Sequence, residues 1–271
     1  MKFLYTGILL LFLAACQQGP AHNVMYESTD SLESFIRDVR VALQERPQDS
    51  ELRMYLANAL IENGQFEAAD SQAIYLAKDS TSLDKAFYIK ALIAFNQNDT
   101  AATIAHLTRA IRQAGERSEY EAVMLNADLL LAKQQPKDAA AYYLLAQRLD
   151  STSAEAQYGF GRTQEIQLNN KTASAHYLLA IQLDPSYSPA YISLGKLSER
   201  ENDTKEAWRY YNLAAKADPT DAEAFYLRGK TFLQLGNKPA GLDDLTKALS
   251  FRKDYTEAKA LLDSVKDRNF Q

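Results

Sequence analysis

The sequence repeats itself with a period of 34 residues, and this feature restricts its fold more than any other. Residues 188–221 and 222–255 align without a gap, so that small residues fall on small ones and aromatic residues on aromatic ones. The register extends back to residue 50, interrupted by a two-residue insertion at Ser118 and Glu119. A period of this length predicts a stack of similar units, each burying its apolar face against a neighbour. The six units are residues 50–83, 84–119, 120–153, 154–187, 188–221 and 222–255.

The residues that recur predict two closely packed helices in each unit. The eighth position is always small, which lets the first helix approach the second: Ala57, Ala91, Ala127, Gly161, Gly195 and Gly229. The twenty-fourth position is large in the later units and fills the space between them: Leu107, Tyr143, Tyr177, Tyr211 and Leu245. Pro185 and Pro219 begin turns between units, where a helix must end. Only 10 Gly and 7 Pro occur in 271 residues, which also favours helix.

This pattern resembles the tetratricopeptide repeat, a helix–turn–helix unit of 34 residues. The resemblance implies an all-α fold, a right-handed α-solenoid of six tandem repeats. Residues 30–49 are expected to form an N-terminal capping helix, or half repeat, because Asp30 offers an N-cap with Glu33 three residues on. Residues 256–271 are expected to form the C-terminal capping helix. Caps are needed because a terminal repeat has no further neighbour to cover its apolar face.

The resemblance also implies a partner-binding groove. In this family the first helix of each repeat lines a concave surface, chiefly through positions 2, 5, 9, 12 and 13. Positions 5 and 9 are neighbours on one helix face. The candidate groove residues are Asn58, Tyr88, Tyr158, Arg162, Ile192, Lys196, Tyr226 and Lys230. The last three repeats present a basic row beside an apolar one, which suits a peptide carrying apolar anchors and carboxylates.

Two other interpretations of this surface stay open. Glu165 and Glu199 lie three residues after Arg162 and Lys196, so that pairs within each helix could neutralise the basic row. The tyrosines could equally be partly buried packing residues. The carboxylate clamp of chaperone-binding relatives is not matched, because Asn58 is not followed by the asparagine and lysine expected on the next helices. A receptor for chaperone tails is therefore not expected.

The N-terminus resembles a bacterial lipoprotein signal. Lys2 precedes an apolar run of about a dozen residues ending at Ala15, too short to cross a bilayer as a helix. Leu13-Ala14-Ala15-Cys16 resembles the lipobox, and Cys16 is the only cysteine in the chain. The resemblance implies that residues 1–15 are removed and that Cys16 carries diacylglyceryl and N-acyl lipid, with residues 16–29 as a flexible tether. The alternative is a generic cleavable signal with a chance cysteine.

The same resemblance implies a location. Residue 17, directly after the lipidated cysteine, is glutamine and not aspartate. By the sorting rule of bacterial lipoproteins this favours the outer membrane, with the repeats facing the periplasm. Two or more acyl chains anchor a protein stably where one does not.

Composition and motifs argue against several classes of function. The chain has 30 basic and 35 acidic residues, which does not suit binding to nucleic acid. It has no HExxH, GxSxG or GxGxxG motif, and His106 and His176 fall on second helices two repeats apart. We therefore expect no enzyme, no metal, no cofactor besides the lipid and no small-molecule substrate.

The sequence thus predicts a non-enzymatic scaffold or adaptor for protein–protein interaction, anchored by lipid to the bacterial outer membrane. Its partner would be an envelope protein or a peptide segment bound in the groove. The alternatives are a pilotin-like assembly factor for a type IV pilus or secretion complex, and an adaptor of a cell-wall hydrolase or protease. Five Asp-Ser/Thr-apolar triplets resemble a bacterial O-glycosylation motif, although aspartate and serine also occur in such places as helix caps.

Overall fold

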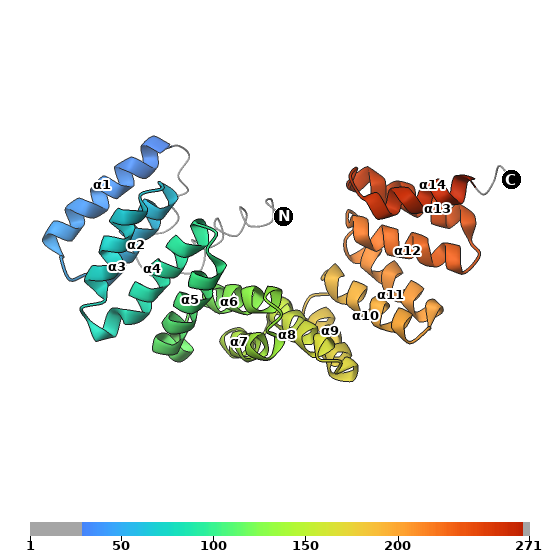
Figure 1. The fold of residues 1–271 in the computed structure, drawn as a ribbon, viewed down its shortest axis with the longest axis horizontal. Helices are drawn as coiled ribbons and strands as arrows, with labels where there is room; N and C mark the ends of the chain where they lie inside the picture. The colour runs from blue at the N-terminus through green and yellow to red at the C-terminus, as the bar shows by residue number, and fades with distance from the viewer. Residues whose placement is uncertain (1–28, 268–271) are drawn as a thin grey trace. The chain divides into compact units, whose positions relative to one another are not determined.

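The computed structural model describes residues 29–267, which form fourteen α-helices, two short 3-10 helices and no strand. They make two compact units, of which the first ends at Leu129 and the second begins at Leu130, within helix α6. The prediction of an all-α chain built from tandem helix pairs is confirmed (Figure 1). Among the described residues, no helix is both long and apolar enough to cross a membrane. The predicted signal peptide, Cys16 and most of the tether lie outside the described residues.

The first unit begins with a single helix and continues with helix pairs. Its helices are α1 (Thr29–Glu45), α2 (Ser50–Glu62), α3 (Phe66–Leu76), α4 (Leu83–Asn96), α5 (Thr100–Ala114) and the start of α6 (Tyr120–Ala132). The 3-10 helices η1 (Ser80–Ser82) and η2 (Gly115–Arg117) lie in the connections before α4 and α6. Helices α4 and α5 pack closely, as do α2 and α3, and α2 also contacts α4 of the next repeat.

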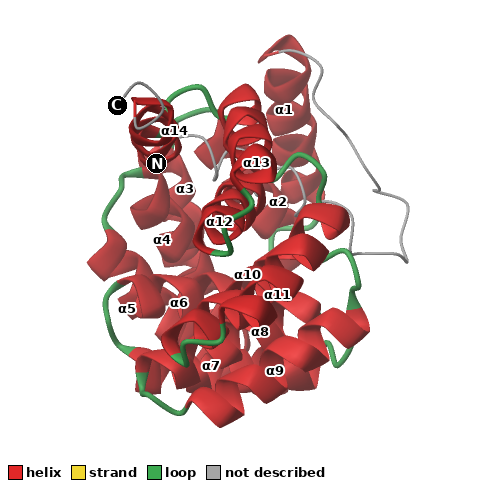
Figure 2. Ribbon diagram, turned by 90° about the vertical axis from the view of Figure 1, so that its right-hand side faces the viewer, coloured by secondary structure: helices red, strands yellow, loops and turns green. Residues whose placement is uncertain are grey.

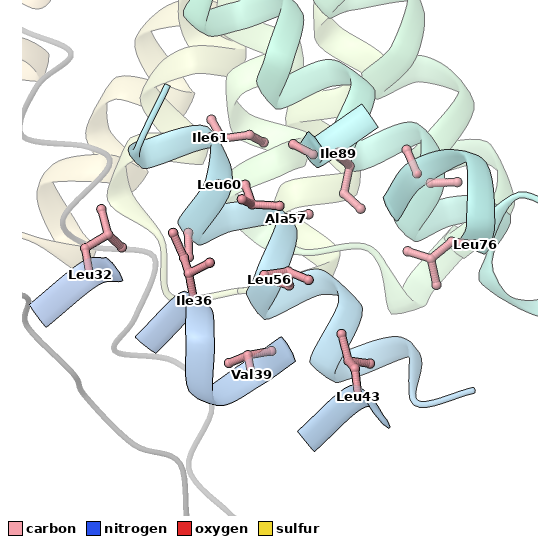
Figure 3. Close-up of a cluster of buried hydrophobic side chains, with 14 residues drawn as sticks. Leu32, Ile36, Val39, Leu43, Leu56, Ala57, Leu60, Ile61, Leu76 and Ile89 are labelled. Carbon is pink, nitrogen blue, oxygen red and sulfur yellow. The ribbon is translucent and has the colours of Figure 1, made fainter. Parts of the chain in front are cut away.

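Helix α1 covers the open side of the first repeat through one apolar face. Leu32, Ile36, Val39 and Leu43 are spaced as residues of one helix face and are buried in a cluster with α2 residues such as Leu56 (Figure 3). Each such side chain contributes about 1.5–3 kcal/mol when fully buried. The sequence predicted a capping helix at this place, and its amphipathic pattern is the reason that it docks.

The second unit contains the later repeats and the closing helix. Its helices are α7 (Pro136–Leu149), α8 (Ala154–Ile166), α9 (Asn170–Leu183), α10 (Ser188–Arg200), α11 (Thr204–Ala217), α12 (Ala222–Gln234), α13 (Lys238–Phe251) and α14 (Thr256–Asp267). Helices consecutive in the chain pack together, α8 on α9, α10 on α11 and α12 on α13, with α14 on α13 (Figures 1 and 2). Ala258 and Leu262 of α14 are buried in the last core cluster.

Glycine and tyrosine interlock where the helices of the second unit pack most closely. Tyr143, Tyr177 and Tyr211 are fully buried. Each ring lies against a glycine: a Cβ atom added to Gly195 would be 2.4 Å from Cε1 of Tyr211, and one added to Gly161 would be 2.7 Å from Cε1 of Tyr177. Real Cβ atoms do not approach other atoms so closely. The small eighth position and the large twenty-fourth therefore form one contact in the repeats of Tyr177 and Tyr211, whereas Tyr143 lies against Gly159 of the next repeat.

The turn between the two helices of each repeat contains one residue with left-handed backbone. These residues, with φ between 60° and 81°, are Gly64, Asn98, Gln134, Leu168, Asn202 and Gly236. A left-handed residue is a common way to end a helix. It costs about 1–2 kcal/mol for a residue with a Cβ atom, yet Leu168 adopts it while 85% exposed. The helices on either side therefore impose the turn at this position, whatever its residue type.

Three of the five Asp-Ser/Thr triplets occur where the aspartate side chain accepts a hydrogen bond from the backbone. Asp79 and Asp150 accept the N–H groups of Thr81 and Thr152 at 2.9 and 2.8 Å, closing short turns. Asp99 caps helix α5 by accepting the N–H of Ala102 at 2.9 Å. These bonds give the three aspartates a structural role that requires no modification.

Candidate functional site

The predicted basic row lies on α8, α10 and α12, but two of its three members are occupied by ion pairs. Nζ of Lys196 lies 2.6 Å from Oε1 of Glu223 on α12. Nζ of Lys230 lies 3.2 Å from Oε1 of Glu199 on α10. Both pairs join one repeat to the next and do not form within a helix. They neutralise the two lysines, so that the row carries less free positive charge than its sequence suggests.

Glu165 does not pair with Arg162 either. Its carboxylate accepts a hydrogen bond from the Tyr177 hydroxyl at 2.5 Å and pairs with Nη2 of Arg200, on α10, at 2.5 Å. Arg162 is exposed, with its guanidinium carbon 5.9 Å from the centre of the Tyr158 ring. No ion pair to Arg162 occurs within residues 29–267. Of the predicted basic residues, only Arg162 presents an unpaired charge.

The apolar row beside these cations is largely covered. Ile192 is 6% exposed and lies in the core, where a ligand would not reach it. Tyr158 contacts the ring of Tyr187 at a centroid distance of 5.3 Å, and Tyr226 contacts the ring of Tyr255 at 5.0 Å. Both tyrosines are half-buried packing residues. Of the six candidate groove residues in the second unit, Arg162 alone is therefore both exposed and without an ion pair among residues 29–267.

An open cleft of about 280 Å³ lies in the first unit. The sequence predicted only two groove residues in this unit, Asn58 in the first repeat and Tyr88 in the second. Met54 and Tyr88, the fifth residues of the first two repeats, both line it, from α2 and α4. Asn58 is exposed on α2 but does not line it. The remaining walls come from the end of α5, the connection through η2 and the start of α6. The structure thus brings the position-5 side chains of two repeats into one concave site.

The charged lining of this cleft has one more carboxylate than it has cations. Its carboxylates belong to Glu51, Asp84 and Glu119, and its cations to Lys85 and Arg117. Nζ of Lys85 lies 2.6 Å from Oε1 of Glu51 and donates to Ser50 Oγ at 2.8 Å, which neutralises Glu51. Within residues 29–267, neither Asp84 nor Glu119 takes part in an ion pair.

Two groups in the cleft have shifted pKa values. The pKa of Glu119 is raised by partial burial of its carboxyl group and by the negative charges of Glu121 and Glu51. The pKa of Tyr88 is raised by burial first, and then by the negative charges of Glu119 and Glu121. Burial is the main cause of both shifts, and the neighbouring negative charges add to it. A cation entering the cleft would lower the cost of keeping these carboxylates ionised.

This cleft was not predicted from the sequence, although one signal pointed to it. Ser118 and Glu119 are the two-residue insertion, and both line the cleft. The insertion lengthens the connection between α5 and α6, in which Gly115 has φ of 61° and Ser118 Oγ donates to the Gly115 carbonyl at 2.6 Å. An insertion that breaks a regular repeat marks a local departure from regular packing.

The two histidines on the second helices pack against aromatic rings. Within the described part of the chain, no group of three or more histidine, cysteine, aspartate or glutamate side chains could hold a metal ion. His176 Nδ1 lies 2.8 Å from Gln157 Oε1 and packs on Phe160, and His106 stacks on Phe87. These contacts make both histidines packing residues.

The fold is thus that of a tandem helical repeat protein, and comparison with known families agrees. Residues 88–154 and 188–221 each match a family model described as tetratricopeptide repeat. These matches identify tetratricopeptide repeats in this chain. No curated protein matches the sequence significantly.

Several solved structures share the fold at low sequence identity. A crystal structure of PilW, described as a widely conserved type IV pilus biogenesis factor, has a TM-score of 0.60 and 18% identity, covering 80% of this chain and 98% of PilW. PilF of Pseudomonas aeruginosa has a TM-score of 0.61 and 12% identity, covering 81% of this chain and 99% of PilF. MamA has a TM-score of 0.52 and 19% identity, covering 66% and 94%. These similarities concern the fold alone.

Proposed function

We propose that this chain is a non-enzymatic scaffold that binds a segment of a partner protein. The observation that carries this proposal is the cleft of about 280 Å³ in which Met54 and Tyr88 face one opening from successive repeats. Concave sites with an apolar base and a few polar groups at the rim are typical binding sites. Most of the walls come from packed helices, and a preformed site lowers the entropic cost of binding.

Site-specific photo-crosslinking tests the binding site. A photoreactive phenylalanine replaces either Arg117 at the cleft or Ile74 on α3, which is exposed in the same unit but does not line the cleft. In intact cells we expect a discrete crosslinked product at position 117 that is absent at position 74. The same products at both positions, or none at either, would contradict a partner site in this cleft.

We further propose that Cys16 anchors the chain in the outer membrane, with the repeats facing the periplasm. The support is the Leu-Ala-Ala-Cys sequence after an apolar run of signal-peptide length, with glutamine following the cysteine. Its role would be to keep the scaffold at the membrane where its partners assemble.

Replacing Cys16 with serine should release the protein from the membrane. Serine cannot accept the thioether-linked lipid, so the apolar contribution of the acyl chains to membrane binding is lost. Fractionation of cells expressing each form should find the wild type with outer membranes and the variant in the soluble periplasmic fraction. A variant that still sediments with membranes would refute lipid anchoring at this residue.

A second candidate function is assembly of a type IV pilus or secretion complex. It is favoured by the similarity to PilW and PilF, each of which is matched over nearly its whole length. The crosslinking experiment separates this candidate from an adaptor of a cell-wall hydrolase or protease. A pilus or secretion subunit crosslinked at position 117 would support assembly, whereas a hydrolase or protease would support the adaptor.

A further inference from the structure

Helices α7 and α9 expose leucine side chains on their outer sides. Leu144 on α7 and Leu178 on α9 occupy the twenty-fifth position of successive repeats and are 40% and 49% exposed. Leu179, next to Leu178, is 42% exposed. Both helices belong to the second unit, and they lie side by side in both views (Figures 1 and 2). The three leucines therefore contribute to one surface.

Cations flank these leucines on the same sides of the two helices. Lys137 lies seven residues before Leu144, and Arg148 lies four residues after it, which places all three on one side of α7. Lys171 lies seven residues before Leu178 on α9. The three cations are exposed, and none of them forms an ion pair within residues 29–267. We call the three leucines and the three cations together the α7–α9 face.

The α7–α9 face is positive, although the chain as a whole is negative. Asp138 is the only acidic residue in α7, and α9 contains none. The whole chain has a net charge of −5. The unpaired cations therefore give this face a local excess of positive charge around exposed leucines.

The next repeat is polar at the corresponding positions. Arg209 and Asn212 of α11 stand where α9 has Ala175 and Leu178. The buried residue through which α11 packs is the tyrosine Tyr211, as in α7 and α9. A second helix of this kind packs with a polar outer side as well, so the packing of the repeats does not account for the exposed leucines.

The chemistry of the face restricts what could cover it. A suitable surface is apolar where it meets the leucines and negative where it meets the cations. A second copy of the same face would bring like charges together, which opposes association. A bilayer with anionic phospholipids supplies both properties, because its phosphates attract lysine and arginine while apolar side chains enter below them. A bilayer also adapts to protruding side chains, whereas a protein partner would need a matching shape.

We propose that the α7–α9 face lies against a bilayer that contains anionic phospholipids. Leu144, Leu178 and Leu179 enter the boundary between headgroups and acyl chains, and the cations contact phosphates. Contacts of this extent bind weakly and reversibly, as a single acyl chain does. The face therefore orients a chain that is already anchored, and Cys16→Ser is still expected in the soluble fraction. This inference goes beyond the scaffold function and uses the proposed anchor only to choose the occupant.

Flotation with lipid vesicles tests the proposal. The protein is residues 16–271 carrying Cys16→Ser, which contains every described helix and no lipid. We expect it to float with vesicles of phosphatidylethanolamine and phosphatidylglycerol, and to bind several-fold more weakly to vesicles of phosphatidylcholine, which have no net charge. Added salt should weaken binding to the anionic vesicles, because it screens the attraction between the cations and the phosphates.

Replacing the leucines tests the apolar part of the face. Leu144→Gln combined with Leu178→Gln should lower binding to the anionic vesicles about tenfold or more, because less apolar surface leaves water. The matched control is Ile74→Gln on α3, which changes the twenty-fifth residue of the first repeat, 54% exposed, and should leave binding unchanged. All three side chains are exposed, and unchanged thermal unfolding would verify that the variants are folded.

Replacing the lysines tests the charged part. Lys137→Gln and Lys171→Gln should each weaken binding to the anionic vesicles about fivefold. Lys205 occupies the same position in the next repeat, on α11, where the neighbouring residues are polar. Lys205→Gln therefore removes an equal charge outside the α7–α9 face and should leave binding unchanged.

Several outcomes would overturn the proposal. They are the absence of vesicle binding, equal binding to the two kinds of vesicle, and binding that the leucine variant or the lysine variants do not change. A lipid-free dimer that the leucine variant dissociates, measured by sedimentation velocity, would assign the face to a second copy instead. A protein crosslinked in cells from a photoreactive residue at position 178, without vesicle binding, would assign it to a partner protein.

These results are distinguishable from a failure of the earlier proposals. The vesicle experiment contains neither a partner protein nor a lipid on residue 16. A lack of crosslinking at position 117 would remove the partner site in the cleft and leave the vesicle result standing. Membrane retention of Cys16→Ser that disappears when the leucine variant is added would show that the face, and not a lipid, holds the chain at the membrane, which would overturn its role as an orienting contact.

Discussion

Replacing Asp244 with alanine is expected to lower the free energy of unfolding of the C-terminal repeats by about 3–5 kcal/mol. Asp244, on α13, accepts two hydrogen bonds from Arg228 on α12, at 2.7 Å from Nε and 2.8 Å from Nη2. The side chains are 3% and 15% exposed, and Nη1 of Arg228 also donates to Asn212 on α11. The variant would leave the buried guanidinium without its carboxylate. Fluorescence of Trp208, the only tryptophan, in a denaturant titration measures the loss.

The neighbouring residue in the same helix provides the control. Asp243 is 64% exposed and pairs with Lys247 one turn on, so Asp243→Ala should cost no more than about 0.5 kcal/mol. Replacing both Arg228 and Asp244 with leucine should recover much of the loss, since no buried charge then lacks a partner. Equal losses of unfolding free energy in Asp244→Ala and Asp243→Ala would show that the buried Arg228–Asp244 pair stabilises the protein no more than an exposed pair does.

Replacing Gly195 with alanine should destabilise the second unit by about 1–3 kcal/mol, the usual cost of overpacking a core. The added Cβ would lie 2.4 Å from Cε1 and 2.7 Å from Cδ1 of the buried Tyr211 ring. The ring is fully buried and cannot move aside without displacing its neighbours. Alanine normally favours helix over glycine by about 1 kcal/mol, so a net loss isolates the steric contact. Denaturant titration of the purified protein measures it.

A second substitution checks that the ring is the cause. The second repeat combines Ala91 at the eighth position with Leu107 at the twenty-fourth, and both are buried there without conflict. Gly195→Ala should therefore cost less in a Tyr211→Leu background than in the wild type, although Tyr211→Leu alone also costs stability through lost packing. Strictly additive effects would rule out the proposed contact.

The fold could be predicted because its determinants recur. A small residue every 34 positions, with a large partner sixteen residues later, specifies a helix pair and its spacing. The amphipathic faces of α1 and α14 were visible in the same way, since each has to cover one neighbour. The left-handed turn residues were not predicted, because Gln134 and Leu168 are not residue types that favour this conformation.

The candidate site could be predicted only in part, because side-chain pairing crosses between repeats. In the sequence, the carboxylate expected to pair with Lys196 is that of Glu199, three residues on. In the structure, Lys196 forms an ion pair with Glu223, and Glu199 forms one with Lys230. Ile192 is at position 5 of its repeat, which predicts a groove residue, but in the structure it is buried in a core cluster. The cleft depends on the two-residue insertion at residues 118 and 119. A periodic pattern predicts the packing of regular repeats, but it does not predict the local structure that an insertion produces.

The ion pairs of the second unit have a consequence for how such an array can change over generations. Glu165 meets Arg200, Glu199 meets Lys230 and Lys196 meets Glu223, so that each pair takes one member from each of two successive repeats. Identical repeats could be exchanged, duplicated or lost without disturbing their junctions. Here the last repeat, which has Leu233 in the place of Glu165 and Glu199, could not be moved forward without leaving a cation of the next repeat unpaired. These charges therefore restrict which repeats can follow one another at the two junctions.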